Sequence, residues 1–231
     1  MPLPVLEHPT FELTVPSSKN AVRYRPFLVK EEKILLMAQE TGDEKEVINA
    51  IKQIIGNCLT EGDFAIEKAP TFDIEYFFLK LRATSVNDII TLTITDEDDQ
   101  SEHEVEVDLK EVEVVFPENV ENIVKVNDDI SLEVRYPTFT DLSNMGELTS
   151  ITDSVELIIS CITKIYNVDE VYDTLDYTAE ELNAFVDSLP TSAFEGLQEF
   201  FTDMPKLTHD VKYKVGKKNK KQTVEGLASF L

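Results

Sequence analysis

A predicted strand passes directly into a predicted helix over residues 21–38, and this junction constrains the fold more than any other stretch. Residues 21–24 alternate apolar and polar side chains, as a half-buried strand does. Pro26 has no N–H and biases Arg25 toward extended geometry, so the strand is expected to end there. Residues 34–38 are good helix formers with an apolar face. The stretch contains no acid–base pair, phosphate loop or metal-ligand spacing, so a structural corner is its simplest interpretation.

Alternation and capping signals predict that the N-terminal part mixes hairpins with helices. Residues 11–24 alternate on both sides of a turn that contains proline and serine, which predicts a hairpin. Asp43 is expected to cap a helix that runs to Leu59, with apolar residues at helical spacing. Another helix is predicted over residues 72–82. It carries two apolar stripes, which indicates a helix that is central or half-covered by a partner.

Two further hairpins are predicted over residues 90–109 and 123–136, where alternation resumes. Beyond them we expect three capped helices that form a small bundle, beginning near Asp153, Thr178 and Ser192. The last segment is read as strand, turn and strand, followed by an apolar end.

These patterns predict an α+β fold. The N-terminal part is expected to hold antiparallel hairpins with two or three helices, and the C-terminal part a helical cluster plus a small hairpin. The irregular stretch around Gly146 indicates the boundary. We therefore expect a mixed α+β domain over 1–140 and a mainly helical domain with a C-terminal hairpin and apolar tail over 141–231.

The charge of the chain limits its partners. It has 45 acidic and 21 basic residues among 231, a formal net charge of −24. Such a chain repels nucleic acid and anionic membranes and is attracted to basic protein surfaces. No stretch is apolar for long enough to span a membrane, and the N-terminus lacks the pattern of a signal peptide. We expect an intracellular protein with no nucleic-acid or membrane partner, in which Cys58 and Cys161 are buried thiols and not a disulfide.

Residues 96–104 form the densest acidic cluster of the chain, and His103 lies within it. Alternating carboxylates could bind calcium, so a calcium- or metal-binding interaction module is the alternative function. The cluster lacks the glycine and the closing glutamate of a helix–loop–helix calcium site. A solvated hairpin tip that discourages strand aggregation is the simpler explanation, and the lysine-rich turn at 216–221 is read in the same way in preference to polyanion binding.

The residues do not suggest catalysis. His8, His103 and His209 lie in unrelated contexts, and no nucleophile lies in a recognisable elbow or dyad. With seven glycines, the chain has no glycine-rich phosphate loop. We predict that it is not an enzyme and has no cofactor, no metal site and no small-molecule substrate.

Several blocks of sequence resemble one known family. They are RPFLVKEEKILLMA from Arg25, FDIEYFFLKLRATSV from Phe72, VRYP from Val134, FFTDMPKL from Phe200 and EGLASF from Glu225. In this order they resemble the baseplate hub subunit and hub assembly proteins of T-even-type contractile-tailed phages. The resemblance implies a non-enzymatic protein of baseplate assembly, located in the host cytoplasm and alternatively in the virion tail baseplate. It leaves open whether the protein is a hub component or an assembly chaperone.

The expected partners are other phage baseplate hub proteins, in a hetero-complex. Large apolar side chains that a domain of this size need not bury are the candidates for the contact. The candidate residues are these side chains and Arg25, which adjoins two of them: Arg25, Pro26, Phe27, Phe72, Tyr76, Leu79, Phe201, Leu227, Phe230 and Leu231. The tail, Leu227–Leu231, could equally fold back on its own hairpin.

Overall fold

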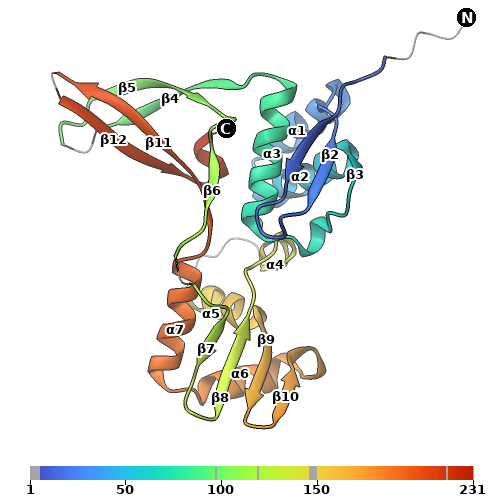
Figure 1. The fold of residues 1–231 in the computed structure, drawn as a ribbon, viewed down its shortest axis with the longest axis vertical. Coiled ribbons are helices and arrows are strands. Elements are labelled where there is room, and N and C mark those ends of the chain that lie inside the picture. The colour runs from blue at the N-terminus through green and yellow to red at the C-terminus, as the bar shows by residue number, and fades with distance from the viewer. Residues whose placement is uncertain (1–5, 97, 119, 146–149, 217, 231) are drawn as a thin grey trace, which may run out of the picture. The chain divides into compact units, whose positions relative to one another are not determined.

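The computed structural model describes residues 6–96, 98–118, 120–145, 150–216 and 218–230 (Figure 1). These residues form seven α-helices and twelve strands in four sheets. The chain divides into two compact units. Unit 1 comprises residues 1–115 and 206–231, and unit 2 comprises residues 116–205. This division differs from the boundary expected near residue 140, because the strands over residues 123–134 belong with the later helices and the last hairpin belongs with the first half of the chain.

Unit 1 begins with a three-stranded antiparallel sheet beside three helices. Its first elements are β1 (Phe11–Thr14), β2 (Ala21–Tyr24), α1 (Val29–Thr41), α2 (Glu44–Cys58), β3 (Leu59–Glu61), a 3-10 turn η1 (Ile66–Lys68) and α3 (Thr71–Ser85). The sheet order is β1-β2-β3, with Leu13 opposite Val22 and Tyr24 opposite Leu59. The Asp43 side chain caps α2 as expected, by accepting a hydrogen bond from the Lys45 N–H at 2.9 Å.

Helix α3 forms the centre of unit 1. Its side chains Ile74, Phe77, Phe78, Leu79 and Leu81 are all 0 % exposed, so both apolar stripes of this helix lie in the interior. Phe77 packs against Tyr24 of β2 and against Phe64, with ring centroids 5.4 and 5.3 Å away. The second half of the unit packs on the other side of this helix, where Tyr76 and Lys80 remain half-buried.

Two hairpins complete unit 1. They consist of β4 (Ile89–Thr95) with β5 (Glu102–Asp108), and of β11 (Lys206–Val215) with β12 (Lys218–Glu225). The short strand β6 (Glu113–Val115) pairs with β11, with Val114 opposite Leu207. A 3-10 turn, η3 (Leu227–Phe230), follows β12 and contacts α3.

Unit 2 is a four-stranded antiparallel sheet with helices, and the predicted helical cluster is wrong. The sheet order is β10-β9-β8-β7. Its elements are β7 (Ile123–Lys125), β8 (Ile130–Val134), α4 (Phe139–Met145), α5 (Ile151–Ser160), β9 (Ile162–Asn167), β10 (Glu170–Asp173), a 3-10 turn η2 (Thr174–Asp176), α6 (Ala179–Asp187) and α7 (Thr191–Thr202). Strands are therefore spread along the whole chain, and helices are not gathered at one end.

The wrong prediction arose where one helix and one strand follow each other without a break in apolar character. A helix that begins near Asp153 would place the apolar residues between Val155 and Tyr166 on one face, but α5 ends at Ser160. Ile162, Thr163 and Ile165 of the next residues are β-branched, a preference of strands, and Ile165 pairs with Leu132 of β8. Leu132 and Leu197 are 0 % exposed in the core that this sheet forms with α5, α6 and α7.

Helix starts in unit 2 follow the capping signals in part. Thr178 and Glu181 form the predicted capping box of α6. At α5 the box consists of Ser150 and Asp153, so Asp153 is the third helical position and not the cap. Helix α7 begins at Thr191, with Pro190 as its N-cap residue, and Ser192 is therefore its second residue and not its cap. Among the described residues, no helix is both long enough and apolar enough to cross a membrane.

Candidate functional site

The strand-to-helix junction of unit 1 is organised around one arginine. The Arg25 guanidinium donates to the Glu31 carboxylate through both terminal nitrogens, with Nη2–Oε1 at 2.9 Å and Nη1–Oε2 at 3.5 Å. The same two nitrogens donate to the backbone oxygens of Pro26 and Asn57, each at 2.9 Å. Arg25 thereby joins the end of β2, the start of α1 and the end of α2.

Glu31 is fully buried, and it is the second half of this arrangement. Its side chain is 0 % exposed and accepts a hydrogen bond from the Leu28 N–H at 3.0 Å. Burial acts to raise the pKa of Glu31, but the hydrogen bonds from Arg25 and Leu28 outweigh it and the pKa is lowered. The carboxylate therefore stays charged beside the arginine, as a buried ion pair must to be tolerated.

Unit 2 repeats the arrangement with Arg135. Its guanidinium forms a bidentate pair with Asp141, at 2.6 and 3.0 Å, and donates to the backbone oxygens of Tyr136 and Ser160, each at 3.1 Å. Asp141 also accepts from the Thr138 N–H at 2.7 Å. In both units the carboxylate lies six residues after the arginine and the capped N–H lies three residues after it.

Each arginine also contacts a buried cysteine. Arg25 Nη1 lies 3.7 Å from Cys58 Sγ, and Arg135 Nη1 lies 3.8 Å from Cys161 Sγ. The backbone N–H of each arginine donates to the carbonyl of its cysteine at 2.9 Å. Burial raises the pKa of both thiols to about 11, although the arginine charge opposes the shift. Both cysteines are free thiols, and they remain protonated and unreactive at neutral pH.

The two units thus share a common frame, although their sequences look unrelated. In each, a hairpin leads through an arginine corner into two helices, and a strand that pairs with the hairpin follows the second helix. The cysteine lies at this junction, as the last residue of α2 in unit 1 and as the C-cap of α5 in unit 2. In each, a later helix preceded by proline follows: α3 in unit 1 and α7 in unit 2. Along the chain, each of these helices is followed by a hairpin of unit 1, β4–β5 after α3 and β11–β12 after α7. These features indicate that the arginine corners are structural.

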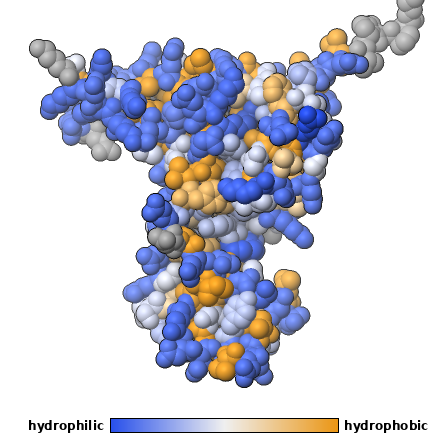
Figure 2. All heavy atoms as spheres, in the orientation of Figure 1, coloured by the Kyte–Doolittle hydropathy of each residue, from blue (hydrophilic) through white to orange (hydrophobic). Residues whose placement is uncertain are grey.

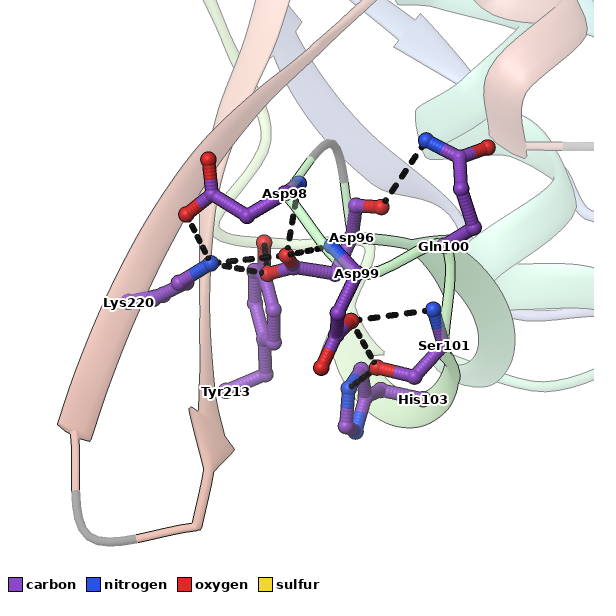
Figure 3. A network of polar contacts seen from close by, with 8 residues as sticks. All are labelled: Asp96, Asp98, Asp99, Gln100, Ser101, His103, Tyr213 and Lys220. Atoms are coloured by element: carbon purple, nitrogen blue, oxygen red, sulfur yellow. Dashed lines mark hydrogen bonds and ion pairs between the residues drawn. The ribbon is translucent and has the colours of Figure 1, made fainter.

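The acidic hairpin tip between β4 and β5 is closed by a lysine from β12 (Figure 3). Asp96 is 0 % exposed, and both of its carboxylate oxygens lie 2.7 Å from Lys220 Nζ. Tyr213 donates its hydroxyl to Asp96 at 2.9 Å, and the Asp98 N–H donates at 2.9 Å. The Lys220 ammonium, followed by these hydrogen bonds, holds the pKa of Asp96 well below its usual range.

This geometry is relevant to the alternative function, calcium or metal binding by the acidic hairpin loop. The ammonium of Lys220 occupies the position between Asp96 and Asp98 where a cation would lie, at 2.7 Å from each carboxylate. His103 accepts or donates a hydrogen bond with Ser101 at 2.7 Å and packs on the Tyr213 ring. Among the residues that the structure describes, no group of three histidine, cysteine, aspartate or glutamate side chains could hold a metal ion. Glu97 of the predicted loop and Lys217 of the basic turn lie outside those residues.

The C-terminal turn is packed against α3. Leu227 is 7 % exposed and Phe230 is 0 % exposed. Arg82 of α3 donates to the backbone oxygen of Phe230 at 3.4 Å. Burial raises the pKa of Glu75, on the same helix, to about 7, while a hydrogen bond from the Leu227 backbone opposes the shift. The tail therefore folds on its own unit here, and Leu231 lies outside the described residues.

Five of the ten residues predicted to contact partners lie in the core of their own unit, including Leu227 and Phe230 of the tail. Phe27, Phe72 and Leu79 are 8 %, 2 % and 0 % exposed. Arg25, Pro26, Tyr76 and Phe201 are half-buried. The Tyr76 hydroxyl donates to Glu113 at 3.0 Å, and the Phe201 ring packs edge-on against Phe200. The four half-buried residues are therefore the predicted contact residues that a partner could still reach.

Sequence reasoning missed an exposed apolar face on α1. Val29, Leu36 and Met37 are 65 %, 52 % and 68 % exposed, and they recur at helical spacing on one side of this helix. We call these three residues the α1 face. Figure 2 shows such apolar residues, in orange, scattered among hydrophilic ones on the surface of the molecule. The helical spacing of residues 29, 36 and 37 was readable from the sequence, but nothing in it said which side of α1 is buried.

One comparison with known proteins gives a match. The sequence model of a family described as T4 bacteriophage base plate protein matches residues 8–231. No curated protein and no solved structure is similar enough to the chain to match it.

Proposed function

Because the chain belongs to the T4 bacteriophage base plate protein family, we propose that it acts in the assembly of the phage baseplate as a hub protein. It does so by binding other hub proteins, either as a component that stays in the hub or as a chaperone that leaves it. The observation that carries the proposal is the extent of the family match, which covers both units.

The surface of the protein is suited to binding proteins and not to binding polyanions. A formal net charge of −24 repels nucleic acid and attracts basic protein surfaces. The α1 face directly follows the Arg25–Phe27 segment and supplies exposed apolar side chains rimmed by charged ones. Such a patch is typical of a protein contact, so we assign the contact of unit 1 to it.

A non-enzymatic role agrees with the chemistry of the buried groups. Both thiols are held protonated, and the buried carboxylates Glu31 and Asp96 are each paired with a cation in a structural arrangement. These groups stabilise corners and hairpins. The proposed role therefore depends on surface contacts with other proteins, and it is tested by following baseplate assembly.

The experiment is quantitative mass spectrometry of purified virions, of baseplate intermediates and of infected-cell lysate. A hub component is present in virions at a fixed ratio to the other baseplate proteins. A chaperone is present in the intermediates and absent from virions. If the chain is in neither fraction, and baseplates assemble normally when its gene carries an early stop codon, the proposal is wrong.

The contact surface is tested separately with the double variant Leu36→Glu/Met37→Glu. We expect it to fold as the parent does and to lose at least tenfold in affinity for its hub partners. The variant Gln39→Glu/Thr41→Glu adds the same two negative charges at two other exposed positions of the same helix and is the matched control. Equal loss in both variants would show that added negative charge, and not the apolar face, weakens binding.

A further inference from the structure

Unit 2 contains a segment that unit 1 lacks. In unit 1, β3 is separated from α3 only by a short loop with η1. In unit 2, β10, η2 and α6 lie between β9 and the corresponding helix α7. The shared frame does not need this added segment, yet it carries several of the most exposed apolar side chains of the protein. Val168, Val171, Leu175 and Tyr177 are 73 %, 59 %, 92 % and 41 % exposed.

An apolar groove of about 360 Å³ opens beside this segment, between the sheet and α6. Ile130 and Ile165 line it from β8 and β9, and Leu182 and Phe185 line it from α6. The Tyr172 and Tyr177 rings, in edge-to-face contact with centroids 6.3 Å apart, form another wall. This volume is within the range of ligand pockets and fits one or two large side chains.

The rim of the groove is held rigidly. The Thr174 hydroxyl is buried and donates to the Ile162 carbonyl at 2.7 Å and to the Thr163 carbonyl at 3.0 Å. The Asp173 side chain accepts from the Leu175 N–H at 3.0 Å. These bonds fix η2 on the sheet, so that Leu175 is held in solvent on an ordered turn. A side chain presented in this way loses little entropy when a partner covers it.

The charges around the groove are of one sign. No lysine or arginine occurs between Lys164 and Lys206. Seven exposed carboxylates lie in or next to the added segment: Asp169, Glu170, Asp173, Asp176, Glu180, Glu181 and Asp187. Anionic ligands and acidic proteins are repelled here, whereas a cationic segment is attracted.

We propose that this groove binds a protein segment that carries a large apolar side chain flanked by lysine or arginine. The apolar side chain enters between Ile165 and Phe185 and is covered by Leu175 and Tyr177. The flanking cations pair with carboxylates such as Asp176 and Glu180. An amphipathic helix with a basic polar face has this chemistry, and binding one in an apolar groove is a recurring mode of recognition. The inference deepens the proposed function by naming the chemistry of one partner, and it rests on that function only in taking the partner to be a protein.

The test uses the full chain and a synthetic 14-residue amphipathic peptide with leucine and phenylalanine on one face and lysine on the other. Binding is followed by NMR chemical-shift changes and calorimetry. A matched peptide has glutamate in place of lysine, and a third keeps the lysines but has serine in place of the apolar residues. The third peptide measures the general attraction of the acidic chain for any cation. None of these probes is a baseplate protein, so failure here is distinct from failure of the baseplate role.

We expect the lysine peptide to shift residues of β10, η2 and α6, and to bind at least tenfold more tightly than either control peptide. Its affinity is expected to fall as salt rises. Leu175→Ser and Tyr177→Ser should each weaken binding at least fivefold. Asp176→Asn/Glu180→Gln should weaken it and reduce its salt dependence. Val171→Ser is the control, because Val171 is exposed on the same strand as Tyr172 but points to the opposite face of the sheet.

The proposal is overturned if the lysine peptide does not bind at millimolar concentration, or if the shifts lie elsewhere. It is also overturned if the glutamate peptide binds equally well, because the groove would then select only for apolar character. A self-association in sedimentation experiments that Tyr177→Ser abolishes would show that a second copy of the chain occupies the groove instead.

Discussion

Lys220 and Asp96 lie 124 positions apart in the sequence, and the lysine ammonium is 2.7 Å from both oxygens of the buried carboxylate. This pair joins the tip of the β4–β5 hairpin to β12. An acidic cluster and a basic cluster that look like separate surface features in the sequence are thus one arrangement in space. The buried carboxylate needs a cation beside it, and the lysine supplies that cation.

Replacing Lys220 by methionine should destabilise unit 1, because the Asp96 carboxylate would remain buried without a cation. We expect the melting temperature to fall on the order of 5 °C, by analogy with other losses of a buried partner. The control is Lys214→Met, an exposed lysine of the same hairpin. The double variant Asp96→Asn/Lys220→Met should recover part of the loss. If the control and Lys220→Met melt alike, the pair has no structural role.

The two arginine corners should differ in their contribution to stability. The side chains of Arg25 and Glu31 are 16 % and 0 % exposed, whereas those of Arg135 and Asp141 are 37 % and 14 % exposed. Removing one partner of a buried pair costs more when the remaining charge cannot reach water. We expect Arg25→Met to lower the free energy of unfolding by about 3 kcal/mol, and Arg135→Met to lower it by clearly less.

Urea unfolding of each variant measures this difference. Arg25→Lys should not rescue the first corner, because one ammonium cannot replace a guanidinium that donates to Glu31, Pro26 and Asn57 together. A full rescue by lysine would mean that charge alone, and not the forked geometry, holds the corner.

Local elements were predictable from the sequence because their signals are local. The Asp43 cap, the Thr178 capping box and the hairpin before Arg25 were each found from a few adjacent residues. The structural interpretation of the Arg25 corner was also derivable, since it needed only the proline and the change of period.

The C-terminal architecture was not predictable in this way. An apolar helix that runs into an apolar strand, as α5 runs into β9, shows no break in hydrophobic character, and periodicity cannot separate them. The role of Asp96 depended on Lys220, a partner from the far end of the chain, and no local pattern indicates such a pairing. The repeated corner had a readable signal, an arginine followed six residues later by a carboxylate and later by a cysteine, but only the shared geometry gives that spacing meaning.

Glu75 should make the stability of unit 1 depend on pH. Its pKa is raised to about 7 from an ordinary value of 4.5, because α3 and the C-terminal turn bury it. The protonated form therefore stabilises the fold. This contribution is fully present below about pH 4.5 and is lost as pH rises through about 7. A shift of this size corresponds to about 3 kcal/mol, which water that reaches the side chain would reduce.

The measurement is the free energy of unfolding from pH 5 to pH 8 for the parent and for Glu75→Gln. We expect the difference between the two proteins to grow in favour of the variant as pH rises. Both proteins carry the same ionisable groups except at residue 75. The comparison therefore removes the general effect of the net charge of −24 on the pH dependence of stability. A difference that does not change with pH would show that Glu75 titrates normally.

The C-terminal turn should be part of the fold of unit 1 before it is part of any interface. Phe230 is 0 % exposed and Leu227 is 7 % exposed, both against α3. Truncating a buried phenylalanine to alanine removes apolar contacts and leaves a cavity, so Phe230→Ala should cost about 3–5 kcal/mol of unfolding free energy. Deleting residues 227–231 should cost at least as much. Ser229→Ala, at an exposed position of the same turn, should cost far less.

The same variants decide whether the tail also contacts partners, as the sequence suggested. If Phe230→Ala lowers stability but the folded protein at low temperature binds its hub partners with unchanged affinity, the tail is structural only. If the deletion leaves the melting temperature unchanged and abolishes partner binding, the buried position of Phe230 is not the one that matters in assembly, and the tail is an interface. Calorimetric unfolding and partner co-purification on the same preparations separate the two outcomes.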